Sequence, residues 1–183
     1  MITDSLRKGG AEKSFSLLFN GLVNKGINVT PCILENFTDP ILPLDTKEIV
    51  SFRSRFTKNR FLKLFRIVSD AVRICMLQRK HEYALMLAFQ HRSNITLVVA
   101  KLISKFSQKK TAPIIVSTRT CIRHRKISFL FPLICMSYKC ADAITVNAHE
   151  IKDNLIEYYG ASPSKIIVIP NGYNKESILS KGA

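Results

Sequence analysis

The sequence predicts an α/β protein built on a doubly wound, Rossmann-like parallel sheet. Short apolar segments typical of buried strands alternate along the chain with segments whose apolar residues recur at the helical period. The C-terminal part contains a complete strand–helix–strand unit, which implies a parallel pair of strands. At 183 residues and 46% hydrophobic composition, the chain is long enough to build the core of one such domain.

The strand–helix–strand unit occupies residues 141–174. We expect a strand at Ala143–Val146, a helix at His149–Tyr159 and a second strand at Ile166–Ile169. Gly160 suits a left-handed helix cap, and Pro170 cannot extend a strand ladder. The boundaries of this unit therefore follow from the sequence.

Earlier in the chain, the apolar period predicts a helix at Ala11–Lys25, ended by Gly26. A strand is expected at Ile27–Leu34, and a short strand or turn around Glu48–Phe52. Pro31 lies within the first of these and indicates an edge strand or a bulge.

The middle of the chain continues the alternation of helices and strands. The elements expected there are a helix at Asn59–Gln78, a strand at Tyr83–Phe89, a helix at Asn94–Phe106, a strand at Ile114–Ser117 and a helix at Ile127–Lys139 that Pro132 interrupts.

The net charge of +15 is concentrated in two segments. Residues 53–80 carry nine Lys and Arg against the single acid Asp70, and residues 101–126 carry eight with no acid. Such a field attracts polyanions, namely acidic lipid surfaces, nucleic acid or phosphorylated substrates. A solvated basic surface without a partner is the alternative.

The sequence shows no signal peptide and no apolar run long enough to cross a bilayer, so we expect a cytoplasmic protein. Its five cysteines form no CxxC pair and are expected as free, mostly buried thiols. The histidines and cysteines show no metal-ligand spacing, so no metal site is predicted.

Two segments at opposite ends of the chain resemble glycosyltransferase family 4, the retaining enzymes of GT-B fold. Ser5–Glu12 (SLRKGGAE) is similar to the first loop of that family, and residues 141–174 are similar to the end of its first domain, which closes on Ile-Pro-Asn-Gly. The resemblance implies that residues 1–174 form the N-terminal, acceptor-binding half of a GT-B enzyme. Residues 175–183 would begin the interdomain linker, the C-terminal donor-binding domain would be absent, and Met1–Thr3 would be the remainder of a truncated first strand.

The resemblance also implies a function. The enzyme would move a sugar from a nucleotide-sugar donor to a glycan or lipid-linked acceptor in cell-surface polysaccharide biosynthesis, on the cytosolic face of the membrane as a peripheral protein. The nucleotide-sugar is a co-substrate, and no other cofactor is implied. Because the donor is held mainly by the second domain in this family, we expect this chain not to be active alone.

Candidate site residues follow strands at one edge of the sheet, although the sequence identifies no catalytic residue. Gly9 and Gly10 precede a helix N-terminus, where positive φ and close backbone approach would suit a donor phosphate. Glu12 lies in the first helical turn, where it caps the helix or, as the resemblance suggests, contacts an acceptor hydroxyl. His91 follows one strand, and Arg119 follows another at the position where many relatives carry a histidine. Arg119 is either a phosphate ligand or a surface arginine.

The helix at Asn59–Gln78 has a basic face beside aromatic residues and is the predicted membrane-docking element. The docking candidates are Arg60, Phe61, Lys63, Phe65 and Arg66. Two alternatives remain: a nucleic-acid-binding module, suggested by aromatics interleaved with basic residues at Phe52–Phe56, and a non-catalytic remnant. No zinc-finger, RRM or KH signature supports the first, so nucleic acid is an unlikely partner.

Overall fold

The computed structural model describes residues 1–7, 9–35, 43–46, 48–54, 59–107, 111–120 and 129–172. Within them, seven parallel strands form one sheet in the order β3-β2-β1-β4-β5-β6-β7. The strands are β1 (Ile2–Thr3), β2 (Cys32–Glu35), β3 (Val50–Ser54), β4 (Met86–Phe89), β5 (Ile114–Thr118), β6 (Ala143–Val146) and β7 (Ile166–Val168). The helices are α1 (Gly10–Asn24), α2 (Arg60–Lys80), α3 (His91–Phe106), α4 (Phe131–Cys140), α5 (His149–Tyr159) and a 3-10 turn at Pro163–Lys165.

This arrangement confirms the predicted doubly wound α/β class. The chain builds the sheet outward in one direction from β1 to β3, and α2 then returns it to β4, on the other side of β1. The strand order therefore reverses between β1 and β4. At such a switch point the loops after neighbouring strands diverge and leave a crevice at the carboxyl edge.

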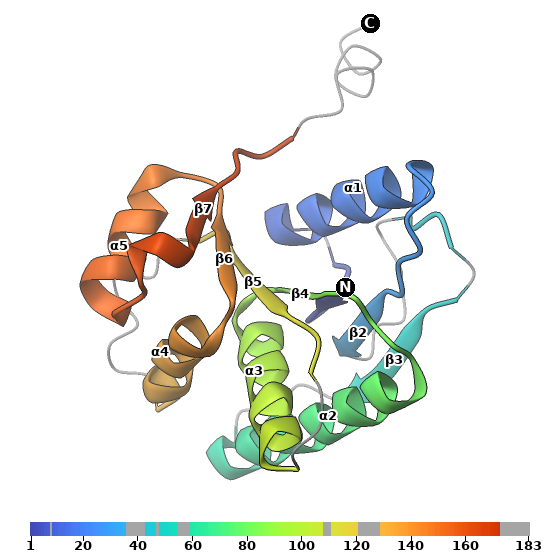
Figure 1. The fold of residues 1–183 in the computed structure, drawn as a ribbon, viewed down its shortest axis with the longest axis horizontal. Coiled ribbons are helices and arrows are strands. Elements are labelled where there is room, and N and C mark those ends of the chain that lie inside the picture. Colours follow the sequence, from blue (N-terminus) through green and yellow to red (C-terminus); the bar gives the residue numbers. More distant parts are fainter. Residues whose placement is uncertain are drawn as a thin grey trace, which may run out of the picture.

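The helices divide between the two faces of the sheet (Figure 1). Helix α1 lies on one face, where Phe15 and Phe19 pack with Phe89 in a small buried cluster. Helices α2 to α5 lie on the other face and cover the larger core, which includes Ala88 and Ile144. Helix α1 begins soon after the end of β1, and its first residues, from Gly10 to Glu12, therefore lie beside the crevice.

The prediction of an edge strand at Pro31 needs correction. Strand β2 begins at Cys32, directly after Pro31, and pairs with both β3 and β1, so it is not an edge strand. Pro31 is tolerated because it precedes the ladder and contributes only its carbonyl, which accepts from Val50 N at 3.0 Å. The predicted irregularity is present, since the β2–β3 register shifts between Ile33 and Glu35.

Strand β1 is short but continuous with the sheet. Ile2 and Thr3 pair with Cys32–Ile33 on one side and Ala88–Phe89 on the other. The short β1 therefore fills the centre of the sheet between β2 and β4. The expectation for residues 175–183 lies outside the described residues, and the domain boundary at 174 stays a prediction.

The remaining helices agree with the sequence except at their starts. Helix α3 begins at His91, three residues before the predicted start. Helix α4 begins at Phe131, with Pro132 in its first turn, where the missing N–H is harmless. Helix α5 matches its prediction, and Gly160 caps it with φ 62°.

Candidate functional site

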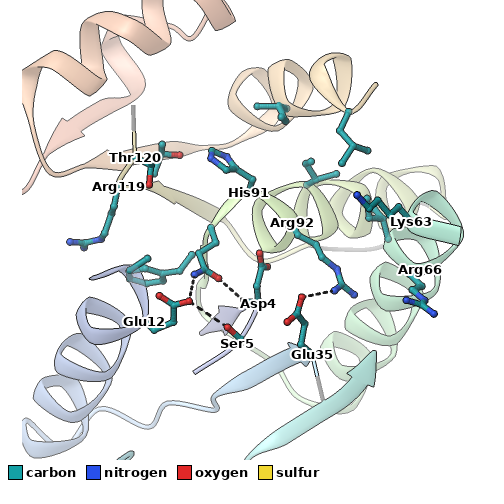
Figure 2. Close-up of a pocket in the computed structure, with 18 of the residues that line it drawn as sticks. Asp4, Ser5, Glu12, Glu35, Lys63, Arg66, His91, Arg92, Arg119 and Thr120 are labelled. Atoms are coloured by element: carbon teal, nitrogen blue, oxygen red, sulfur yellow. Dashed lines mark hydrogen bonds and ion pairs between the residues drawn. The ribbon is translucent and has the colours of Figure 1, made fainter. Parts of the chain in front are cut away.

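A cleft of about 570 Å³ opens at the carboxyl edge of the sheet, at the switch point between β1 and β4. The ends of β1, β2, β4 and β5 form its floor, and α1 and α2 form opposite walls (Figure 2). Its lining residues are Asp4, Ser5, Gly10, Ala11, Glu12, Glu35, Lys63, Arg66, Ile67, Phe89, Gln90, His91, Arg92, Ile95, Thr118, Arg119, Thr120, Leu130 and Ile134. The predicted residues Gly10, Glu12, His91 and Arg119 thus meet in one cleft, as strand ends in a parallel sheet should.

The carboxylate of Glu12 is held at the α1 wall by side chains from other elements. Its Oε1 accepts from Gln90 Nε2 at 2.7 Å and from Ser5 Oγ at 3.4 Å. Gly9 makes room for this arrangement, because a Cβ there would lie 2.1 Å from Glu12 Oε2. Gly9 itself has an extended φ of −161°, and Gly10 lies within the helix, so the positive φ expected for this pair is wrong.

Gln90 connects the two central strands through its side chain. Besides donating to Glu12, it accepts from the backbone N–H of Asp4 at 3.3 Å through Oε1. Its backbone has φ 76° and ψ 161°, a region occupied almost only by glycine. A residue that holds such a conformation costs about 1–3 kcal/mol, and such strain gathers at functional sites. The side chain of Gln90 therefore fixes the geometry of the cleft floor at an energetic cost.

Asp4 directly follows β1 and caps the start of α3. Its Oδ1 accepts from the backbone N–H of Ser93 at 2.7 Å and from the Ser93 hydroxyl. Burial raises the pKa of Asp4 to about 6, opposed by the Ser93 hydrogen bonds and by Arg92. The carboxylate of Asp4 thus holds the first turn of α3, and with it His91, against the floor of the cleft.

Arg119 lies at the β5 end of the cleft. Its guanidinium carbon is 5.3 Å from the centroid of the Phe89 ring, and Nη1 donates to Asn171 Oδ1. Its Nε is buried with no hydrogen-bond partner within the described structure. Burial lowers the pKa of Arg119 from its ordinary value. A half-buried guanidinium with an unsatisfied donor beside a cleft is suited to an anionic ligand.

Arg92 links the central strands to α2. It contacts Asp70 at 2.8 Å and Glu35 at 3.4 Å, and the Asp70 side chain is only 1% exposed. Asp70 also lies 3.7 Å from Arg73. The only acid of residues 53–80 is therefore buried in ion pairs, and it does not neutralise the outer surface of α2.

The five predicted docking residues divide between two surfaces. Lys63 and Arg66 line the cleft and are partly buried. Phe61 and Phe65 are 85% and 69% exposed on the outside of α2. Arg60 lies with its guanidinium carbon 5.7 Å from the Phe129 ring.

Other residues singled out in the sequence lie elsewhere. Phe56 is outside the described residues. Phe52 is partly buried, 5.6 Å from the Arg73 guanidinium, and packs on the core. The sequence reasoning missed Asp4, Gln90 and Glu35, although each directly follows a strand or ends one, the same signal that found His91.

The described residues contain no group of three or more His, Cys, Asp or Glu side chains placed to hold a metal ion. None of the described helices combines the length and the hydrophobicity that a membrane span requires.

A family model for glycosyltransferase family 4 matches residues 8–177, nearly the whole chain. The chain belongs to glycosyltransferase family 4. The resemblance of the two terminal segments is thereby confirmed. A search of curated proteins found no match.

Solved structures of glycosyltransferases share the fold. The apo form of the lipopolysaccharide outer core galactosyltransferase WaaB matches with a TM-score of 0.65 and 18% identity over 94% of this chain and 45% of WaaB. Anabaena HepE in complex with UDP and glucose matches with a TM-score of 0.62 and 18% identity over 94% of this chain and 44% of HepE. Sucrose-phosphate synthase from Thermosynechococcus elongatus matches with a TM-score of 0.61 and 12% identity over 100% of this chain and 94% of that one.

At these identities the structural likeness shows the fold alone. This chain spans about half the length of WaaB and HepE. It corresponds to one Rossmann-like half of those proteins, as the sequence predicts.

Proposed function

We propose that this chain forms the acceptor-binding half of a glycosyltransferase that moves a hexose from a nucleotide-sugar to a glycan or lipid-linked acceptor in polysaccharide biosynthesis. The observation that carries the proposal is the cleft at the switch point, where Gly10, Glu12 and Arg119 converge in a chain of this family. HepE, which shares the fold, is described in complex with UDP-glucose, which supports a nucleotide-sugar donor.

The two kinds of polar group in the cleft suit two parts of the reaction. The guanidinium of Arg119 and the N-terminus of α1 favour the negative charge of a donor phosphate, which grows as the sugar leaves. The carboxylate of Glu12, fixed by Gln90, can accept a hydrogen bond from an acceptor hydroxyl and orient it. That the reaction needs no metal ion stays a prediction.

We further propose that the enzyme works at the surface of an anionic membrane. Phe61, Phe65, Val68, Val72 and Met76 form an exposed apolar stripe along α2, at the spacing of one helix face. The exposed Arg79 and Lys80 continue the same helix, and its one acid is buried. An apolar stripe on a basic helix matches the interface of acidic lipids, and the proposed location is the cytosolic face of the membrane.

The function can be tested in the native cell. Disrupting the gene should remove one sugar from a cell-surface glycan, detected by mass spectrometry, and the wild-type gene should restore it. Arg119→Ala should fail to restore it, whereas Lys105→Ala, an equal change of charge at an exposed position on α3, should succeed. An unchanged glycan profile after disruption would rule the proposal out.

A further inference from the structure

Two uncharged groups hold the guanidinium of Arg119. The ring of Phe89 lies against it, with 5.3 Å between the ring centroid and the guanidinium carbon. At its edge, Nη1 donates to Oδ1 of Asn171. Among the described residues, no carboxylate forms an ion pair with Arg119. The guanidinium is therefore oriented while its charge is not neutralised.

Asn171 reaches Arg119 from a distant strand of the sheet. It follows β7, whereas Arg119 follows β5, and β6 lies between the two strands. The amide of Ile169 donates to the carbonyl of Val146 at 2.7 Å, which extends the β6–β7 ladder and fixes where the chain leaves the sheet. In Figure 2 the Arg119 side chain extends from the end of β5 toward α1, and Oδ1 of Asn171 lies 3.5 Å from the Ser14 hydroxyl of that helix. The Asn171 side chain thus lies where the end of β5 meets the start of α1.

The contact with Asn171 leaves part of the guanidinium for a ligand. Because Asn171 uses Nη1, the edge formed by Nε and Nη2 is the one that can donate two parallel hydrogen bonds to a phosphate. The buried Nε has no hydrogen-bond partner within the described structure, and a phosphate oxygen at this edge would satisfy it. On the basis of the function proposed above, we propose that Asn171 is a positioning residue that holds Arg119 in place for the donor phosphate.

An asparagine suits this task better than a charged residue. Its carboxamide oxygen accepts a hydrogen bond without carrying a negative charge. An aspartate would also accept from Nη1, but its charge would pair with Arg119 and repel a phosphate. A guanidinium that is already oriented loses little conformational entropy when the phosphate binds, so Asn171 strengthens binding without touching the ligand.

Two measurements on the purified chain separate the orientation of Arg119 from its charge. Heteronuclear NMR of the arginine side chains reports rotation about the Nε–Cζ bond, and a spectrum of Arg119→Lys identifies the Arg119 signals. Calorimetric titration with inorganic pyrophosphate reports binding. Asn171→Ala should speed the rotation and weaken pyrophosphate binding about fivefold, the cost of ordering one free arginine side chain. Asn171→Asp should keep the slow rotation but weaken binding about tenfold, because a negative charge now faces the ligand.

Asn20→Ala is the matched control. The Asn20 carboxamide also makes hydrogen bonds, with Pro43 and Asp45, but it lies in the second half of α1 and does not line the cleft. This variant should leave the Arg119 signals unchanged and alter pyrophosphate binding less than twofold. Adding Asn171→Ala to Arg119→Ala should cause no further loss of binding, since Asn171 acts through Arg119. A melting curve for each variant checks that the fold is intact.

Three results would overturn the proposal. They are undetectable binding of pyrophosphate to the wild type, an Arg119 rotation that Asn171→Ala leaves unchanged, and equal losses of affinity in Asn171→Ala and Asn20→Ala. None of these measurements involves sugar transfer. Their failure is therefore distinct from an unchanged glycan profile after gene disruption, which would overturn the transferase proposal.

Discussion

The α1 and α2 walls of the cleft are built on different principles. At the α1 wall, Glu12 is fixed by Gln90 and Ser5, and Gln90 is itself held to the end of β1. At the α2 wall, the buried ion pairs of Asp70 lie behind the surface, and the groups that face outward are cationic or apolar. The polar groups of the α1 wall are thus fixed by hydrogen bonds, whereas the α2 wall presents basic and apolar side chains in front of its ion pairs. Substitutions in each wall test this contrast.

The largest change in the free energy of unfolding is expected where the α2 wall joins the sheet. Asp70→Asn removes the charge that compensates Arg92 in a buried position, which should lower the free energy of unfolding by about 4 kcal/mol. Denaturant unfolding measures the loss. Glu35→Gln, which weakens only the longer contact of Arg92, should cost about 1 kcal/mol. Equal losses would show that the α2 wall does not depend on the Asp70 pair.

The next largest effect on stability concerns Asp4, behind the α1 wall, and depends on pH. Since the pKa of Asp4 is about 6 in the folded protein, above its ordinary 3.8, the folded state binds a proton more tightly than the unfolded state. The stability that this tighter proton binding adds to the folded state is fully present below about pH 4 and is lost as the pH rises through 6. The change amounts to about 3 kcal/mol for a shift of this size.

Asp4→Asn keeps an acceptor for the Ser93 amide but cannot ionise. The variant should therefore be more stable than the wild type at pH 7 and lack the decline between pH 4 and 6. Urea unfolding of both proteins across this range measures the difference. Parallel curves would show that Asp4 does not carry the pH dependence.

A smaller effect should reveal the strain at Gln90. Gln90→Ala removes both side-chain hydrogen bonds and keeps the unfavourable backbone, whereas Gln90→Gly removes the bonds and relieves the backbone. The glycine variant should be about 1 kcal/mol more stable than the alanine variant. At Gln78, within α2, the order should reverse by about 1 kcal/mol, because glycine weakens a helix interior. The same order at both positions would argue against strain at the α1 wall.

The sequence predicts the carboxyl-edge residues because a parallel sheet brings its strand ends together whatever the details of packing. It does not predict the Asp4–Ser93 contact, which joins residues 89 positions apart and depends on the exact register of β1 and β4. The positive φ of Gln90 likewise does not follow from its residue type. The Asp4–Ser93 contact and the Gln90 conformation arise only once the strands of the sheet have paired.

The helical period is enough to predict which residues of α2 share a face. At 100° per residue, Lys63 lies about 200° from Phe61, so the two cannot share one docking surface. Ile67, Ala71 and Ile74 set the buried face and thereby turn Lys63 toward the cleft. The sequence places basic and aromatic residues together because they are neighbours along the chain, but the helix separates them in space.

The smallest effect on stability is expected at the apolar stripe of α2. Changing both Phe61 and Phe65 to serine should alter the free energy of unfolding by less than about 0.5 kcal/mol, since both side chains are mostly exposed. The double variant should nevertheless bind acidic vesicles about tenfold more weakly or worse in sedimentation, because each inserted ring contributes roughly 1.5–3 kcal/mol.

Phe106→Ser, at a side chain 91% exposed at the end of α3, is the control and should leave vesicle binding unchanged. Wild-type binding should fall at high salt and with neutral vesicles, since the basic residues of α2 attract acidic headgroups. Equal binding to acidic and neutral vesicles would exclude the membrane role of the α2 wall and leave the stripe without its proposed partner.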